Sequence, residues 1–281
     1  MKIKTLLSLL IMVPMFTIYA QNGYSVDLNI KTEPADKITL NETSIGISAY
    51  KNIDTKNKIT NTLQYKNIGV KYDIENYDFK YNYNPYNSIK NTLVVTHLLT
   101  QKTTLNLEIE PTLNFQENLN LSDLSVLGGL EINQVINKNN TINIGVKRTN
   151  TLGLPKITPT FSFYHKISEA ATMTIGFPNS AITYSNNERN VFRLTNSFNG
   201  DFFNLDNTKY LDGNTATKAS LSQITTALEY ERNMDGNWFV NFKAGYDFNK
   251  KYQLSNHDND NVYDFNIGNS YILNIGIKYK H

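Results

Sequence analysis

Apolar and polar side chains alternate one by one along most of the chain, and this period of two limits the possible folds most strongly. In residues 271–279, the odd positions carry aliphatic and aromatic side chains, whereas the even positions are mostly Asn, Gly and Lys. Successive side chains of a strand point to opposite faces, so one face of this segment is apolar and the other is mostly polar. Tyr271 and Tyr279 end the apolar face, as is typical of a strand that crosses lipid between two interfaces.

The same alternation recurs along the chain, and no segment after residue 21 shows a helical period near 3.6 residues. The pattern predicts strands at residues 24–30, 43–53, 59–74, 89–100, 103–115, 123–137, 141–148, 157–167, 171–177, 180–185, 190–204, 219–232, 238–248 and 270–280. The strand at residues 59–74 changes parity between Tyr65 and Ile68, which predicts a β-bulge near Lys66 and Asn67.

The connections between these strands alternate between short and long. Short turns are expected at residues 54–58, 101–102, 138–140, 168–170, 186–189 and 233–237. Longer links are expected at residues 31–42, 75–88, 116–122, 149–156, 205–218 and 249–269, and Pro178 with Asn179 is the one short member of that set. Outer-membrane barrels have short periplasmic turns and longer outer loops, so this order places both termini in the periplasm.

We therefore predict an all-β protein, a single antiparallel transmembrane β-barrel of about 14 strands, with a range of about 12 to 16. A soluble sandwich or a lipocalin-like barrel also alternates apolar and polar residues, with the apolar face as its packed core. Strands of ten or more residues and a polar face rich in Gly, Asn and Ser favour the membrane barrel. The mean hydropathy of −0.42 excludes a bundle of transmembrane helices.

The N-terminus reads as a secretory signal peptide over residues 1–20, followed by the barrel domain over residues 21–281. Lys2 and Lys4 precede an apolar run at residues 6–18, and Ala20 precedes the polar Gln21. The run is shorter than the roughly 20 residues of a spanning helix, so an uncleaved anchor is the weaker alternative. We predict cleavage after Ala20 and location in the outer membrane. The junction has no Cys, which argues against a lipid anchor.

Charge and cysteine content exclude several classes of function. The chain has 27 basic and 25 acidic side chains, and loss of Lys2 and Lys4 with the signal leaves 25 of each. A nucleic-acid-binding protein normally shows a clustered basic excess, which this chain lacks. Without Cys, the chain forms no disulfide, thiolate centre or Cys-based metal site. We predict no nucleic-acid partner, no metal and no cofactor.

One short run resembles a known family. The segments at residues 176–180, 182–185 and 200–205, which read GFPNS, ITYS and GDFFNL, resemble a run shared by a family of uncharacterised outer-membrane β-barrels known as a domain of unknown function. The resemblance implies an outer-membrane barrel and supplies no ligand or catalytic residue. Many such barrels end on an aromatic residue that the barrel-insertion machinery reads, whereas here Lys280 and His281 follow Tyr279.

Polar residues on the face opposite the apolar stripes are expected to line the lumen. These residues are Asn106, Glu108, Glu110, Glu131, Lys147, Lys166, Lys243, Asp247, Asn274 and Lys278, with Arg193 and Glu231 of the same parity. Glu108 and Glu110 share a face roughly 7 Å apart, which suits acid–base chemistry, but opposite charges around them favour a network of lumen salt bridges.

Two loops are candidate binding sites. The aromatic side chains Tyr77, Phe79, Tyr81, Tyr83 and Tyr86 gather in the long link 75–88, where they are suited either to stack on a ligand or to extend an interfacial girdle. Asp258, Asp260 and Asp264 suggest Ca²⁺, but the segment lacks the mid-loop Gly and final Glu of an EF-hand, so a solvated loop is the preferred interpretation.

The preferred functional hypothesis is passive or accessory transport of small polar solutes. A structural or surface-binding barrel that does not conduct is the first alternative, and a lipid-modifying barrel enzyme is the second. That enzyme needs a Ser oriented by a His, but Ser162 and Ser168 lie three residues from His165 and so face away from it in a strand. We expect no enzymatic activity, and the expected partners are outer-membrane lipid and, during biogenesis, the insertion machinery.

Overall fold

A computed structural model describes residues 23–72, 85–211, 214–265 and 267–281, with side chains in residues 207–214 left out of the description. The strands are β1 (Gly23–Glu33), β2 (Ile38–Asn52), β3 (Asn57–Tyr72), β4 (Tyr86–Thr100), β5 (Thr103–Phe115), β6 (Leu124–Val135), β7 (Asn140–Thr149), β8 (Lys156–Lys166), β9 (Ala171–Phe177), β10 (Asn179–Asn187), β11 (Asn190–Leu211), β12 (Asn214–Asp235), β13 (Trp238–Ser255), β14 (Asn261–Asp264) and β15 (Ser270–Lys280). A 3₁₀ turn, η2 (Leu121–Asp123), precedes β6.

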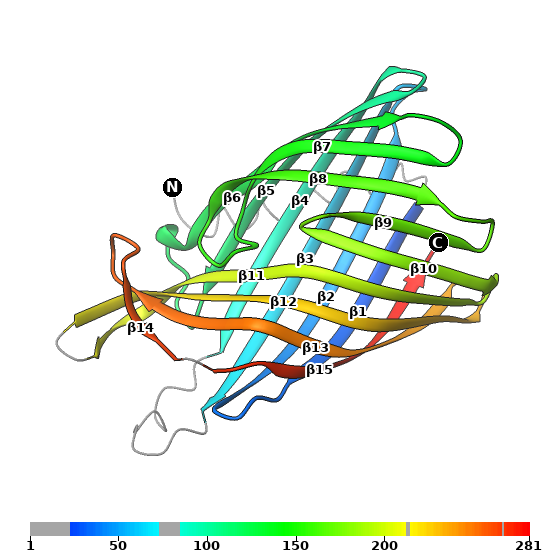
Figure 1. Cartoon of the computed structure of the whole chain (residues 1–281). Coiled ribbons are helices and arrows are strands. Elements are labelled where there is room, and N and C mark those ends of the chain that lie inside the picture. Colours follow the sequence, from blue (N-terminus) through cyan, green and yellow to red (C-terminus); the bar gives the residue numbers. More distant parts are fainter. Residues whose placement is uncertain (1–22, 73–84, 212–213, 266) are drawn as a thin grey trace.

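The strands close into one antiparallel barrel. From β1 to β13 each strand pairs with the next one in the sequence, β13 pairs with β15, and β15 pairs with β1 to complete the ring. The short β14 pairs only with β13, so the barrel has 14 strands. This architecture, drawn in Figure 1, confirms the predicted all-β fold and strand number.

Short hairpin turns gather at one end of the barrel, together with the end of β15, and we call this the turn end; the opposite end is the loop end (Figure 1). Four turns share one device, in which a side-chain oxygen of Asp54, Asn137, Ser168 or Asn187 accepts the backbone N–H groups two and three residues later. Such turns reverse the chain in two to four residues and satisfy the backbone donors that the strands leave over.

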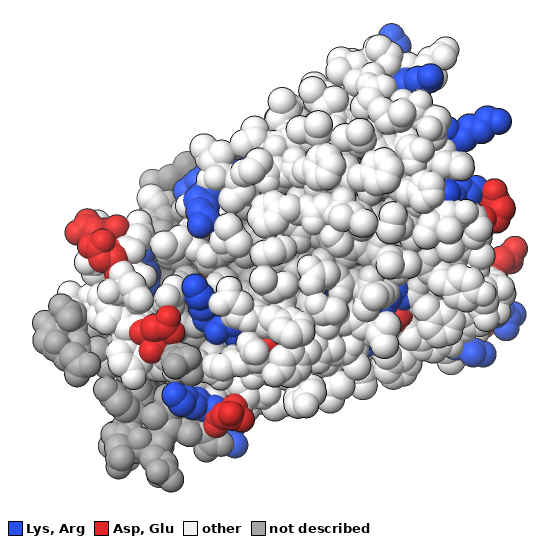
Figure 2. Space-filling model, in the orientation of Figure 1, with Lys and Arg blue, Asp and Glu red and all other residues white. Residues whose placement is uncertain are grey.

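The outward face of the barrel is apolar. Large hydrophobic side chains stay exposed on neighbouring strands, for example Ile30 at 62%, Ile144 at 59% and Leu273 at 54%. Figure 2 shows a broad band without charged side chains around the middle of the visible face, with Lys, Arg, Asp and Glu gathered toward the two ends. A band of this kind matches the lipid-facing surface of a membrane barrel. Among the described residues, no helix is both long and apolar enough to cross a membrane.

Several strand boundaries differ from those predicted, and the largest differences are at the loop end. Residues 31–42, expected as a long link, are mostly strand, and β11 and β12 extend to Leu211 and Asn214. The predicted bulge near Lys66 and Asn67 is wrong, because β3 pairs with β2 and β4 without a register shift. A register shift does occur in β13, where Asn249 adopts φ 49° opposite the interval between Ser222 and Ile224.

Without that bulge, the parity of β3 has another physical meaning. Ile68 and Val70 point into the barrel and are only 3% and 6% exposed. They belong to a hydrophobic cluster inside the barrel, which we call the loop-end core. Its members are Ile38, Leu40, Ile68, Val70, Tyr86, Phe203, Ala216, Ala219, Leu221, Tyr252, Leu254, Phe265 and Ile267. The apolar side chains of β3 therefore move from the lipid face to the interior at the loop end.

The loop-end core joins opposite walls of the barrel. Strands β4 and β11 lie seven positions apart in either direction around the ring. Even so, the rings of Tyr86 and Phe203 stack with centroids 4.6 Å apart. The Tyr86 and Tyr252 hydroxyls are hydrogen-bonded at 2.7 Å, and Asn204 Nδ2 donates to the Ser122 carbonyl at 2.7 Å. The interior is thus filled with side chains at the loop end.

Candidate functional site

The interior between the turn end and the loop-end core carries ion pairs along its walls. On one wall, Lys147 of β7 lies 2.8 Å from Glu108 of β5 and 3.0 Å from Glu131 of β6. Gly129 and Gly145 leave room for these long side chains, because an added Cβ at either would overlap the backbone or side chain of Lys147 or Glu131. The three charged residues were proposed from parity to line the lumen, and the structure brings them together.

A second group of charges lies on the wall formed by β11, β12, β13 and β15. Glu231 accepts ion pairs from Lys278 at 3.2 Å, Lys280 at 3.5 Å and Arg193 at 3.7 Å. Lys243 pairs with Glu229 at 2.9 Å. These contacts join adjacent strands or, for Lys278 and Lys280 of β15, strands separated only by β13. They therefore run along the wall of the barrel and do not cross the lumen. A cavity of about 200 Å³ lies against this wall.

The other residues predicted to line the lumen have different surroundings. Thr96 donates to Asn106 at 2.8 Å, and Thr92 donates to Glu110 at 2.7 Å. The Asn274 side chain lines the same cavity as Lys243 and Lys278. Lys166 lies at the turn end and pairs with Glu169 of the adjoining turn at 2.6 Å, away from the Lys147 group.

Asp247 belongs to a fully buried polar cluster and not to an open wall. It is 0% exposed and accepts hydrogen bonds from Thr225 at 2.6 Å and Ser270 at 3.2 Å. The nearby Lys250 ammonium lies 3.9 Å from Asp247 and 2.6 Å from Glu33, with both partners of the Lys250–Glu33 pair at most 1% exposed. The shift at Asn249 points Lys250 inward, because β13 changes parity there.

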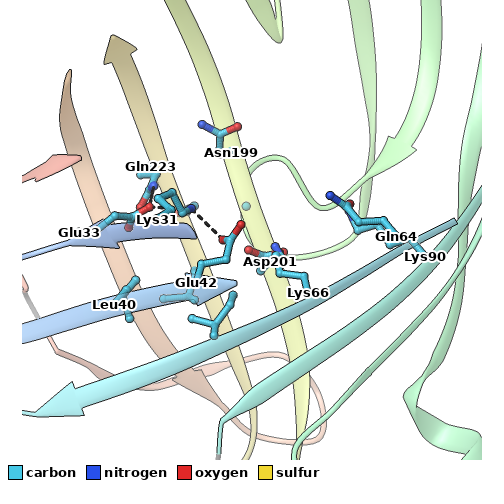
Figure 3. Close-up of a pocket in the computed structure, with 14 residues that line it drawn as sticks. Lys31, Glu33, Leu40, Glu42, Gln64, Lys66, Lys90, Asn199, Asp201 and Gln223 are labelled. Atoms are coloured by element: carbon cyan, nitrogen blue, oxygen red, sulfur yellow. Dashed lines mark hydrogen bonds and ion pairs between the residues drawn. The ribbon is translucent and has the colours of Figure 1, made fainter. Parts of the chain in front are cut away.

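A cavity of about 240 Å³ lies where the polar interior meets the loop-end core, as drawn in Figure 3. Lys31 bridges Glu33 and Glu42 at 2.8 Å each on its β1–β2 side. On the opposite side, Lys66 of β3 forms an ion pair with Asp201 of β11, directly across the barrel. Sequence reasoning missed this site because residues 31–42 were assigned to a loop, although Lys31 and Glu33 continue the inward parity of Asp27 and Asn29.

The proposed aromatic loop is only partly described. Tyr77, Phe79, Tyr81 and Tyr83 lie outside the described residues. The placement of Tyr86 in an exposed loop is wrong, because it is the first residue of β4 and is 3% exposed within the loop-end core. Its ring contacts Phe203 and its hydroxyl contacts Tyr252, so its apolar ring and polar tip are both occupied by the protein.

The histidines and the acidic loop have simple local roles. His165 and His97 each place Nδ1 2.7 Å from an Asn side chain, Asn140 and Asn57 respectively, on the outward side of the turn end. In the loop at the end of β13, Asn256 accepts the backbone N–H groups of Asp258 and Asp260 at 2.9 Å, which forms a capped turn. Among the described residues, no group of three or more His, Asp or Glu side chains is arranged to hold a metal ion.

Comparison with known proteins agrees with this architecture. A family model described as a domain of unknown function (DUF6268) matches residues 17–280. The chain belongs to this family. The matched residues include the GFPNS and GDFFNL segments that resemble an outer-membrane family. A search of curated proteins found no match.

Solved structures with a similar fold are outer-membrane barrels. An outer membrane channel from Pseudomonas putida F1 superposes with a TM-score of 0.51 at 7% identity, covering 93% of this chain and 96% of that one. The NanC porin gives a TM-score of 0.43 at 8% identity, with 90% and 98% covered. The KdgM porin gives 0.39 at 6% identity, with 91% and 98% covered. At such identities the likeness to the Pseudomonas channel shows the fold alone, which is that of an outer-membrane β-barrel.

Proposed function

We propose that this protein is an outer-membrane channel for small polar solutes, and that the loop-end core closes it in the state described here. The main support for this proposal is the arrangement of charged side chains inside the barrel. Below the loop-end core, every ion pair of the Lys147 and Glu231 groups joins adjacent strands or strands with a single strand between them, which leaves the lumen unbridged. A polar interior of this kind, enclosed by an apolar outer face, is typical of barrels that hold water.

The chemistry of the walls supports small polar solutes over a strongly charged one. Acidic and basic side chains in the lumen pair and neutralise one another, as Lys147 does with Glu108 and Glu131. A passing solute therefore meets many hydrogen-bonding groups but no large field of one sign. We propose transport and not catalysis. Of the two serines considered with His165, Ser162 faces inward, whereas His165 is bonded to Asn140 on the outward side.

The proposed route to the membrane follows from the N-terminal pattern. Residues 1–22 lie outside the described residues, so cleavage after Ala20 stays a prediction. Export through a removed signal peptide and assembly by the insertion machinery, with lipid around the apolar band, would place the turn end in the periplasm and the loop end outside. Mass spectrometry of the protein purified from outer membranes tests this directly, since a mature chain beginning at Gln21 is expected.

Single-channel recording in a planar bilayer tests the channel proposal. The purified chain is compared with Phe203→Ala, which removes the ring that bridges β11 to Tyr86, and with Phe161→Ala, an outward-facing control. We expect rare or small openings for the unmodified chain and for Phe161→Ala, and openings at least several-fold more frequent for Phe203→Ala. A shift on gels between unheated and boiled samples verifies folding before each recording. Folded, inserted protein that stays silent in all three forms would overturn the proposal.

A barrel that does not conduct is the second candidate, and one observation favours it. The contacts between opposite walls include Tyr86 with Phe203, Tyr86 with Tyr252, and the Lys66–Asp201 ion pair. Such a filled end also suits a structural or surface-binding role, in which the loop end presents a rigid platform. Silence of the Phe203→Ala barrel would favour this second candidate.

A further inference from the structure

The β9–β10 hairpin is too short to reach the loop end of the barrel. β9 has 7 residues and β10 has 9, whereas β11 and β12 have 22 each. At about 3.3 Å per residue and a tilt of about 40°, β9 rises roughly 18 Å along the membrane normal, less than the roughly 25 Å apolar band of such barrels. The barrel wall therefore has a notch above the turn at Pro178 and Asn179.

The apolar outer face continues on the β7–β8 side of this notch, and the strands on both sides have unpaired edges there. In β8, pairing with β9 ends at Phe161, so residues 156–160 pair only with β7. Outward-facing residues at this height include Val146, 47% exposed, and Ile157, 73% exposed. In β11, pairing with β10 ends at Ser197, and the residues that follow pair only with β12. Free strand edges are tolerated at membrane depth only where protein or a water-filled cavity covers them.

The β7–β8 connection covers the notch. An added Cβ at Gly200 of β11 would overlap the Asn150 carbonyl oxygen, so the connection lies directly on β11. An added Cβ at Gly153 would lie 3.5 Å from the Ser220 Cβ of β12. Residues 150–153 thus rest against the outward side of the β11–β12 pair and seal a gap that strand pairing leaves open.

Two cavities of about 280 Å³ each lie on the two sides of this segment, and Thr151 lines both. The inner cavity reaches the lumen charges Glu131 and Lys147 and extends to the turn at Pro178. The outer cavity has an apolar floor of Phe198 and Ile224.

The rim of the outer cavity is basic. It carries Lys156 and Lys251, and no acidic side chain lines this cavity. An apolar floor beside two ammonium groups at a membrane interface fits a hydrocarbon chain that ends in an anionic head group. Among the residues that line the two cavities, Thr151 is common to both, so the segment around Thr151 separates the inner cavity from the outer one.

We propose that the notch is a lateral passage between the lumen and the outer leaflet, that residues 150–153 are its movable cover, and that it takes single-chain amphiphiles with an acidic head group. The passage goes beyond the proposed function, because it leaves the barrel through the wall and bypasses the loop-end core. The lateral passage does not require that polar solutes move through the barrel along its axis.

A disulfide between positions 153 and 220 provides the test, because the chain has no Cys of its own. The 3.5 Å separation of the two Cβ positions fits disulfide geometry. Gly153→Cys with Ser220→Cys is made together with Trp238→Phe and Thr174→Trp, which places the only tryptophan in the inner cavity. The strain of Cys at φ 94° is common to the oxidised and reduced forms and cancels between them.

The probe is 12-bromododecanoic acid dissolved in the bilayer, which quenches tryptophan on contact. We expect quenching of the Thr174→Trp reporter to be at least threefold stronger in the reduced form than in the oxidised form. A matched reporter, Ile175→Trp, replaces an outward side chain that is 53% exposed, and its quenching should be the same in both forms. Equal quenching of the Thr174→Trp reporter in the two forms would overturn the passage, whatever the conductance of the channel.

A second pair of variants serves if the disulfide prevents folding. Gly200→Ala should displace residues 150–153 and increase quenching of the Thr174→Trp reporter in an otherwise Cys-free chain. Gly69→Ala is the matched control, because its Cβ would meet only the Asn41 carbonyl at an ordinary 3.8 Å. If Gly200→Ala and Gly69→Ala give the same quenching, the cover does not control access and the proposal is wrong.

Discussion

The two halves of the barrel interior are stabilised in opposite ways. Toward the turn end, Lys147 and Glu231 pair with charges no more than two strands away around the ring, so each contact stays within one wall. At the loop end, Tyr86 and Phe203 reach each other from opposite walls. Ion pairs along a wall leave the lumen unbridged, whereas apolar side chains must meet across it to escape water. One barrel can therefore combine a hydrated half with a packed half.

The largest expected effect comes from the packed half. Phe203 is 0% exposed, and its replacement by Ala should destabilise the loop end by about 4 kcal/mol, since a buried Phe→Ala change costs about 3–5 kcal/mol. Hydrogen exchange should show faster exchange in the loop-end parts of β4, β11 and β13, with the turn end unchanged. Uniform protection in the variant would mean that the two halves are not independent.

The buried Lys250–Glu33 pair is expected to rank second. Glu33→Gln leaves an ammonium that is 0% exposed without its closest carboxylate, and loss of one partner of a buried pair costs about 3 kcal/mol or more. Resistance of the folded barrel to thermal unfolding, followed by the gel shift on boiling, should fall clearly. Lys250→Met together with Glu33→Gln is the control, and it should recover part of the loss because the buried ammonium is removed together with its closest carboxylate.

A smaller effect is expected at Lys147 in the hydrated half. Lys147→Met removes the cation between Glu108 and Glu131, and because water screens a partly exposed site the stability change should be about 1 kcal/mol or less. Selectivity should respond more than stability, with a severalfold rise in preference for cations measured by reversal potentials in the Phe203→Ala background. Lys102→Met, at an exposed turn, is the control. Unchanged selectivity would remove Lys147 from the conducting path.

The smallest effect concerns the turn that joins β2 and β3. Hydrogen bonds from the Asn57 side chain and from the Lys56 and Asn57 backbone lower the pKa of Asp54. Because the folded pKa is depressed, the carboxylate stabilises the turn above the unfolded pKa of about 3.9, and this contribution is lost as pH falls through the folded pKa. The Lys56 amide resonance in micelles should therefore titrate with a midpoint below about 3.9. A midpoint at or above that value would contradict the assigned hydrogen bonds.

Most of the fold could be predicted because alternation is a local property of a strand. Leu273, Ile275 and Ile277 face lipid and are roughly half exposed, as their parity indicated. The predictions are wrong where the environment of one face of a strand changes along its length. Ile68 and Val70 break the outward stripe of β3 because they enter the loop-end core, whereas a bulge was the local explanation of the same pattern.

In the candidate site, too, contacts between nearby strands could be predicted from the sequence, whereas contacts across the barrel could not. The pairing of Lys147 with Glu108 and Glu131 needs only the consecutive strands β5, β6 and β7, so parity and sequence order were enough to suggest a lumen network. The Lys66–Asp201 ion pair joins residues 135 positions apart on opposite walls, and no local pattern relates them. The cavity beneath the loop-end core was therefore outside the reach of sequence reasoning.

By itself, the sequence determined the strands, their order and the face that each side chain takes, because hydrogen-bonded neighbours and a period of two act over short distances. Only the tertiary structure decided where opposite walls touch and where the wall is incomplete. Closure of the ring brings Phe203 against Tyr86, and the short β9 leaves an edge that residues 150–153 cover. Both features depend on the curvature and relative heights of all 14 strands, which no single segment encodes.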